Sequence, residues 1–587
     1  MKLNKLALAC SVTACLSPIL TTSVFAKTIN GQVVTKSGEA IANAAVLVRG
    51  SNKPIITDEN GNFSFDDGDK KSIELHTKAK AFSHDTRIID AESFDGTPVK
   101  IVLGNSVIEV IDVYATPLHS SNIESAVPVT VISGDALKLK HSSTLGETLK
   151  NEVGVHSTYY GPVASSPIIR GLDGPRVLIT QNGLDVSDAS RVGPDHVVST
   201  ETSTATQVEV LRGPATLFFG SGAIGGVVNV VDERVPTSTE TQFDYMLQHN
   251  TVADENEGSF NLNTGKNNFA FHLDAFARKS DDYSIPGHAE LDPHDEDEDH
   301  EEEEHDEHEE METAFYDKSF NNTSLAFNIG RELNDFIKVD LGFASVERAP
   351  SSIELFMNGA HLATGRFEVG NVNLQSETSN NVDLTVSIDN AGFFASATLF
   401  ANKVDNYIYL RDETEEEHEE HDEEHEEDHD EHGGLILSNY LQQDADLDGY
   451  EIEFGNTMEL GSGELTMSFG RDVISGEFSS GGNIPRLNPA RNIFKLKYSK
   501  DDMTLGLNFK DVEKQNDIAV NETLTVGYQM LNAKLSRTID LGSQGELTLS
   551  LFGNNMLDEV ARNHSSFVKN EVPLPGRNYG LRFNLKL

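Results

Sequence analysis

The sequence has very few residues that form disulfides or thiolate metal sites. Its 587 residues include two cysteines and no tryptophan. Both cysteines, Cys10 and Cys15, lie within the first 26 residues. If that segment is removed as a leader, disulfide bridges and thiolate ligands are excluded from the mature chain. Without Trp, only Phe and Tyr can supply large aromatic surfaces.

Positive charge is scarce as well. The chain has 45 Lys and Arg residues against 95 Asp and Glu residues, which gives a formal net charge of -50. Nucleic acid is excluded as a partner because phosphate binding needs a basic surface. The sequence also offers no set of nucleophile, base and acid, so we do not expect an enzyme.

Long apolar runs are missing beyond the N-terminus. Residues 1–26 combine Lys2 and Lys5, an apolar stretch from Leu6 to Leu20, and a small-residue pattern ending at Ala26. This order predicts a secretory signal peptide cut after Ala26, with a membrane anchor or a lipoprotein cleavage site at Val12–Cys15 as alternatives. No later run is long enough for a membrane helix, but a transmembrane β-barrel needs only alternating segments of about ten residues.

Two segments consist almost entirely of Asp, Glu and His. These acidic runs, residues 292–312 and 412–432, hold fifteen carboxylates each. They cannot bury a core, but carboxylate and imidazole ligands suit zinc and related divalent ions. The alternative is a solvated acidic loop, and we predict metal binding because both runs contain several histidines. These are His294, His300, His305 and His308 in the first run, and His418, His421, His425, His429 and His432 in the second.

The chain before the first acidic run divides into three parts. Residues 27–104 alternate in short β segments whose motifs GQVV, AIANAAVLVRG and TDENGNFSF resemble the carboxypeptidase-regulatory-like β-sandwich. Residues 105–118 contain the extended segment VIEVIDVYATP, either a linker strand or an edge strand for a partner. Residues 119–236 form a compact α+β segment in which Ser143–Leu149 carries a helix-cap signal. Its Gly-rich turns are not a P-loop, because no Lys-Ser/Thr follows them.

Residues 237–587 alternate in strand-sized pieces. In the segment from Phe269 to Ala277 the apolar residues Phe269, Phe271, Leu273 and Ala275 fall on one face, and Leu581 to Leu587 repeats the pattern. Further examples begin at Phe336, Phe393 and Met503. A period of two with apolar residues toward lipid is typical of barrel strands, and a soluble β-sandwich is the alternative.

Several long motifs resemble those of TonB-dependent outer-membrane receptors. They are PIIRG (167–171), RVLITQNG (176–183), VEVLRGPATLFFGSGAIGGVVNVV (208–231), ERAPSSIELFMNGAHLATGRFEVGN (347–371), and LFGNNMLDE with PLPGRNYGLRFNLKL near the C-terminus. The resemblance spans residues 107–587. It implies a mainly β fold: the N-terminal β-sandwich, an α+β plug domain over 119–236, and a C-terminal transmembrane antiparallel β-barrel over 237–587. The acidic runs would lie in the barrel loops 288–312 and 412–432.

The same resemblance implies energised import across a Gram-negative outer membrane. NGAHLATG and FEVGN, with the His-rich acidic loops, look like the zinc-uptake branch. Zinc would then be a transported ligand, with no tightly bound cofactor, and the partners would be TonB and outer-membrane lipid. The TonB box would be Glu109, Val110, Ile111, Asp112 and Val113. The resemblance places metal ligands at Asp195, His196, Glu354 and His361.

The chain departs from the family in strand number. It has about fourteen strand-like segments after Thr239, where transporters of this class have 22. The shortfall falls between Arg278 and Phe320, next to the first acidic run. Three alternatives to zinc import therefore stay open: a siderophore receptor, a copper or nickel receptor, and a surface metal-binding protein that does not transport.

Overall fold

The computed structural model describes residues 28–103, residues 113 and 114, and residues 129–587, with gaps in the first and last of these ranges. The longest gaps are 288–317 and 415–433. The chain divides into two compact units, a small one that ends at Leu103 and a large one that extends to Leu587. The nine histidines of the acidic runs lie outside the described residues.

The small unit consists of two β-sheets. One has the strand order β4-β1-β7 and the other β3-β2-β5-β6. Alternating residues such as Ile29, Val33 and Ile101 are buried, which is the pattern of strands with one face in a core. The predicted N-terminal β domain is confirmed. Its strands are β1 Thr28–Thr35, β2 Ala45–Val48, β3 Ile55–Ile56, β4 Asn62–Asp66, β5 Ser72–Lys78, β6 Asp85–Asp90 and β7 Val99–Leu103.

The plug is the first part of the large unit. Its five-stranded sheet has the order β12-β11-β14-β13-β8, and α1 and α2 pack on its apolar side chains. The predicted helix cap is present, because the side chain of Thr144 accepts a hydrogen bond from the backbone of Glu147. The elements are β8 Val129–Ser133, α1 Gly134–Lys140, α2 Leu145–Leu149, β9 Val155–Ser157, β10 Pro167–Ile169, η1 Gly174–Arg176, β11 Val177–Gln181, β12 Leu184–Asp185, η2 Ala189–Arg191, β13 Gln207–Leu211 and β14 Gly226–Val231.

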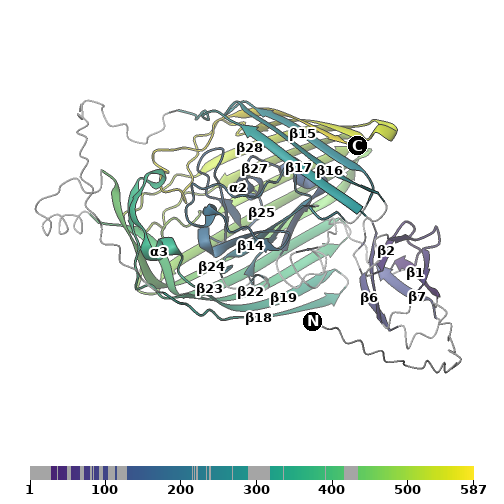
Figure 1. The fold of residues 1–587 in the computed structure, drawn as a ribbon, viewed down its shortest axis with the longest axis horizontal. Helices are drawn as coiled ribbons and strands as arrows, with labels where there is room; N and C mark the ends of the chain where they lie inside the picture. The colour runs from purple at the N-terminus through teal and green to yellow at the C-terminus, as the bar shows by residue number, and fades with distance from the viewer. Residues whose placement is uncertain are drawn as a thin grey trace, which may run out of the picture. The chain divides into compact units, whose positions relative to one another are not determined.

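A large antiparallel sheet curves around the plug (Figure 1). Fourteen strands follow one another along it in the described part of the chain, as the sequence pattern predicts. They are β15 Gln242–Asn250, β16 Glu255–Lys266, β17 Phe269–Lys279, β18 Ser324–Asn334, β19 Ile337–Arg348, β22 Glu377–Asn390, β23 Phe393–Asp412, β24 Ile436–Leu460, β25 Gly463–Phe478, β26 Arg491–Lys500, β27 Met503–Val512, β28 Tyr528–Asp540, β29 Glu546–Asn554 and β30 Asn578–Lys586.

Short and long connections alternate between these strands, as in outer-membrane barrels. Tight turns join β16 to β17, β22 to β23 and β24 to β25 at one end. The long connections at the other end include residues 280–323 and 413–435, which contain the acidic runs. The connection from β19 to β22 carries α3 Ser352–Phe356, β20 Asn358–His361, η4 Leu362–Thr364 and β21 Arg366–Val369.

Buried ion pairs join the plug to the barrel wall. Arg170, from the PIIRG motif, pairs with Asp383 at 2.5 Å and with Glu451 at 2.9 Å. Arg176 pairs with Glu377 at 2.6 Å. These side chains are almost inaccessible to solvent, and buried charges of this kind need their partners. The plug is therefore bound to several strands of the wall.

The large sheet does not close on itself within the described residues. Its two ends are β17 and β18, which are consecutive along the chain. In the described part, β17 pairs only with β16, and β18 pairs only with β19. In Figure 1 the two strands lie on opposite sides of the plug strand β14. The sheet thus ends where the sequence has its shortfall of strands.

Candidate metal site between the plug and the barrel

Two of the predicted metal ligands, Asp195 and His361, are in contact at the long-loop end of the barrel, and a third, His196, lies beside them. Asp195 and His196 lie in the plug loop after η2, and His361 ends β20. The Nε2 atom of His361 is 3.1 Å from Oδ1 of Asp195, and the rings of His361 and His196 lie 6.5 Å apart between centroids. The separation of 3.1 Å is close to the roughly 3.3 Å expected between two ligands, each about 2 Å from a tetrahedral zinc ion.

Close approach of the backbone shapes the plug loop. A Cβ atom at Gly193 would lie 2.6 Å from Oδ1 of Asp195 and 3.1 Å from the His196 ring. Any side chain at this position would displace both residues. Gly193 therefore allows the carboxylate and the imidazole to lie together under His361.

Glu368 completes the group and was missed by the sequence analysis. Its Oε1 atom is 2.8 Å from Nδ1 of His361, and its carboxylate accepts hydrogen bonds from the hydroxyls of Thr364 and Tyr440. The hydrogen bond to Glu368 is the main cause that raises the pKa of His361, together with the charges of Glu368 and Asp195 and against the effect of burial. A carboxylate behind one ring nitrogen commonly orients a histidine so that the other nitrogen can bind a metal.

Glu354, the fourth predicted ligand, is engaged elsewhere. Both of its oxygens lie 2.9 Å from the guanidinium of Arg348, and it forms a capping box with Ser351 at the start of α3. The positive charge of Arg348 outweighs burial and lowers the pKa of Glu354. The structure therefore gives Glu354 a structural contact and does not bring it to the group of Asp195, His196 and His361.

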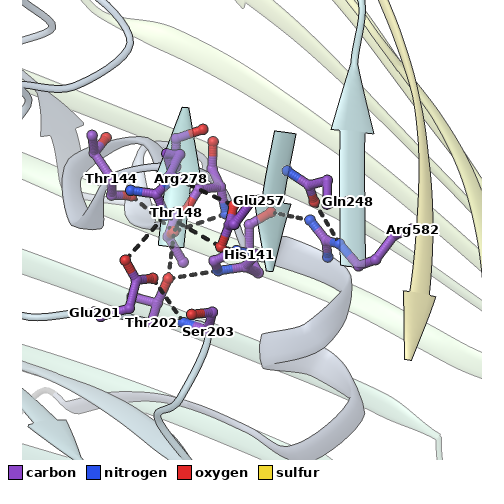
Figure 2. Close-up of polar contacts among 12 residues, drawn as sticks. His141, Thr144, Thr148, Glu201, Thr202, Ser203, Gln248, Glu257, Arg278 and Arg582 are labelled. Carbon is purple, nitrogen blue, oxygen red and sulfur yellow. Dashed lines mark hydrogen bonds and ion pairs between the residues drawn. The ribbon is translucent and has the colours of Figure 1, made fainter. Parts of the chain in front are cut away.

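A second cluster of possible ligands lies between the plug and strands β16 and β17 (Figure 2). Ligand atoms of His141, Glu201 and Glu257 lie within 4.8 Å of one another. However, the guanidinium of Arg278 is 3.0 Å from Glu201 and 3.2 Å from Glu257. His141 is bonded as well, to Glu257 at 3.0 Å and to Thr202 at 2.7 Å. Arg278 balances the two carboxylates, so we interpret this cluster as a contact that joins plug and wall.

Only the end of the predicted TonB box lies within the described residues. Val113 is buried against Leu178, Leu211 and Val227 of the plug. The backbone N–H of Tyr114 donates a hydrogen bond of 2.6 Å to Oε1 of Glu209. Residues 109–112 lie outside the described part of the chain.

The described chain on either side of residues 415–433, which hold most of the second acidic run, lies next to β21. Its first residue, Asp412, forms an ion pair of 2.7 Å with Arg366 on β21, the strand that carries Glu368. After the run, Ile436 on β24 pairs in parallel with Arg366. Asp412 also lies opposite Ser438 across the pair β23–β24. The start of the run and the strand that follows it are thus both held next to β21.

Among the described helices, none is both long and apolar enough to cross a membrane. The chain matches three family models: the carboxypeptidase regulatory-like domain over residues 28–104, the TonB-dependent receptor plug domain over 121–227, and the TonB-dependent receptor-like β-barrel over 295–556.

Solved structures of similar fold include a copper transporter, OprC, with 14% identity and a TM-score of 0.60. A mutant of the ferric enterobactin receptor PfeA from Pseudomonas aeruginosa has 15% identity and a TM-score of 0.57. The siderophore receptor PirA from Acinetobacter baumannii has 14% identity and a TM-score of 0.53. Each alignment covers 78% of this chain and 98% of the other. These likenesses show the shared fold, and the zinc-uptake branch finds no separate support in them. With its plug, its barrel and its N-terminal carboxypeptidase regulatory-like domain, the chain belongs to the TonB-dependent receptors of the outer membrane, a family of receptors and transporters rather than enzymes.

Proposed function

We propose that this receptor binds divalent zinc at Asp195, His196 and His361 and passes it through the outer membrane. The convergence of these three residues with Glu368 carries the proposal. Asp195 and His196 come from the plug, whereas His361 and Glu368 come from a barrel loop. A ligand held between plug and wall is lost when either part moves, which suits an ion that must be released.

The ligand types favour zinc over softer ions. The group offers one carboxylate and two imidazoles, with Glu368 orienting His361, and the mature chain is expected to lack thiols. Such a set suits zinc, and Cu(II) or Ni(II) are the nearest competitors. OprC is described as a copper transporter, so copper is the ion to compare first. Siderophores are the ligands of other similar receptors.

The acidic runs would collect cations above this site. Their carboxylates raise the local concentration of divalent ions at the barrel mouth. The ion pair between Asp412 and Arg366 supports a short path for ions from the second run to the site. It holds the first residue of that run beside β21, the strand that carries Glu368. The nine histidines of the runs would supply weak, exchangeable ligands.

Import would use TonB, as in the family. We propose that residues 109–113 form the box and that residues 1–26 direct export as a cleaved leader. Val113 is buried against the plug, so force that TonB exerts on the box would act directly on the plug core. This contact supports a role of the box in moving the plug.

Zinc accumulation in zinc-starved cells tests the proposal. Cells expressing His361→Ala are expected to accumulate less zinc than wild type, whereas His249→Ala, an exposed histidine on β15, should behave as wild type. Equal accumulation in the His361 variant and wild type would refute the site. Competition with copper and nickel on the purified receptor tests the identity of the ion.

A receptor that only holds metal at the surface is the second candidate, because the sheet has fourteen strands in the described part. Deleting residues 107–115 separates the two. An importer keeps metal binding and loses uptake, whereas for a passive binder neither metal binding nor the metal content of the cells changes.

A further inference from the structure

In the described part of the chain, each of the two edge strands of the barrel sheet has a neighbouring strand on one side only. β17 and β18 each have 11 residues, long enough to cross the apolar layer of an outer membrane. Both strands carry exposed apolar residues on the lipid side: Phe271 is 62% exposed on β17 and Phe327 is 61% exposed on β18. Phe276, which faces the lumen side of β17, is 52% exposed as well.

Such edges are costly in a bilayer. Lipid offers no hydrogen bonds, so each unpaired backbone N–H or C=O along an edge raises the free energy, and membrane strands therefore occur in closed sheets. The connection between the two strands, residues 280–323, is 44 residues long. It is much shorter than the roughly 80 residues that eight strands of about ten residues would need.

Closure within one chain is opposed by the plug, which contacts both edges. Glu201 of the plug pairs with Arg278 on β17 at 3.0 Å. Ile224 of the plug packs against Ala344 and Val346 on β19 and against Ala326 on β18. Barrels that contain a plug have 22 strands, and barrels of 16 to 18 strands have room only for a channel. A closed ring of 14 strands would be narrower still and would have to lose the plug.

We propose that β17 of one copy pairs with β18 of a second copy, and that a two-fold axis along the membrane normal relates the two. β17 and β18 run in opposite directions across the membrane, because an odd number of connections separates them. Rotation about that axis keeps these directions, so both seams become antiparallel. Each copy contributes 14 strands, so the ring would have twice 14, or 28, an even number within the range known for outer-membrane barrels.

The side chains of the two strands are complementary in one register. Placing Leu273 opposite Ile329 puts Ala275 opposite Phe327 on the lipid side. On the lumen side the same register places Phe276 opposite Ala326. Phe327 and Phe276 thus each face an alanine, one on each side of the seam, while Leu273 and Ile329 form an apolar pair, and none of these three pairs brings like charges together. A shift by one residue would reverse the faces and is excluded by the apolar pattern.

The absence of cysteine from the expected mature chain allows a direct test by cross-linking. Leu273→Cys and Ile329→Cys are expressed in the same cells as two separate full-length receptors, and outer membranes are treated with a short bis-maleimide. Directly opposite side chains have Cβ atoms about 5 Å apart, and diagonal neighbours about 7–8 Å, so the reagent also tolerates a shift of two residues. We expect a product of twice the receptor mass that appears only when both variants are present.

The matched control is Leu262→Cys with Leu273→Cys in one chain. These residues lie opposite each other across β16 and β17, so they link within the chain wherever the barrel has folded. Two results would overturn the proposal while this control still links. One is a chain carrying both Leu273→Cys and Ile329→Cys that links only to itself, because the barrel then closes alone. The other is no link between the two single variants, because lipid or a different protein then covers the edges.

Discussion

Replacement of Glu368 by Gln is expected to weaken zinc binding about 10- to 100-fold, or roughly 1.4–2.7 kcal/mol. Glu368 itself is not expected to touch the ion. Its carboxylate accepts a hydrogen bond of 2.8 Å from Nδ1 of His361. This contact orients the ring so that Nε2 points toward Asp195. The amide of Gln carries no charge, so the imidazole becomes a weaker donor to the metal and loses part of its fixed orientation.

The magnitude follows from the surroundings of the carboxylate. Glu368 is 2% exposed, so water cannot replace the lost charge. Gln has nearly the same volume, so no cavity is left and no packing term is added. The hydroxyls of Thr364 and Tyr440 can rotate to accept the new N–H groups. The fold should therefore persist, and the change should appear in affinity.

Competition of the purified receptor with a chromophoric zinc chelator measures this affinity. The acidic runs must be removed first, because they would bind many ions. The second deletion should span residues 415–432 and keep Asp412, whose ion pair with Arg366 holds β21 in place. Glu354→Gln is the matched control, a buried glutamate of the same loop that contacts Arg348. It should lower thermal stability and leave zinc affinity unchanged. Unchanged affinity in Glu368→Gln, or an equal loss in both variants, would refute the reasoning.

Three further outcomes are expected. Arg170→Met leaves two buried wall carboxylates short of a cation and should lower the free energy of unfolding by about 3 kcal/mol, measured by thermal or denaturant unfolding. Val113→Ala removes buried methyl groups worth roughly 1–2 kcal/mol and should speed hydrogen exchange at the Tyr114 amide; an unchanged rate would argue against docking of this segment on the plug. Burial lowers the pKa of His564, so the folded loop binds fewer protons than the unfolded one. Stability of residues 555–577 should therefore fall as the pH drops below about 6.5, seen as faster exchange at pH 5.5 than at pH 7.5 after correction for the intrinsic rate, and His564→Gln should remove the difference.

The fold could be predicted because its signals are local. Alternation in Phe269–Ala277 and Leu581–Leu587 depends only on neighbouring residues, and both segments are strands. The shortfall between Arg278 and Phe320 was visible because strands of similar length can be counted along the chain. The ends of the sheet at β17 and β18, within the described residues, could be inferred only from the connection between these strands. The sequence of neither strand shows which strand it pairs with.

The site was only partly predictable. The Asp195-His196 pair and His361 came from the family motif, but their meeting joins residues more than 160 positions apart. Glu368 was missed because its contact depends on the hairpin β20–β21, which sets His361 opposite Arg366. Glu354 carries the same chemistry as Glu368, but its position three residues after Ser351 favours a capping box. The pairing of Arg170 with Asp383 and Glu451 likewise depends on tertiary contacts.

The pairing of β23 with β24 next to the second acidic run has an evolutionary consequence. Asp412 and Ser438 lie opposite each other, so the chain between them is an insertion into a hairpin that is already paired below it. Doubling the length of such an insertion costs only about 0.6 kcal/mol in loop entropy. Under the proposed function, selection can therefore lengthen, shorten or recode the run as the supply of metal in a habitat changes. The contact between Asp195 and His361 does not depend on the length of the run, so metal collection and metal selectivity could evolve separately.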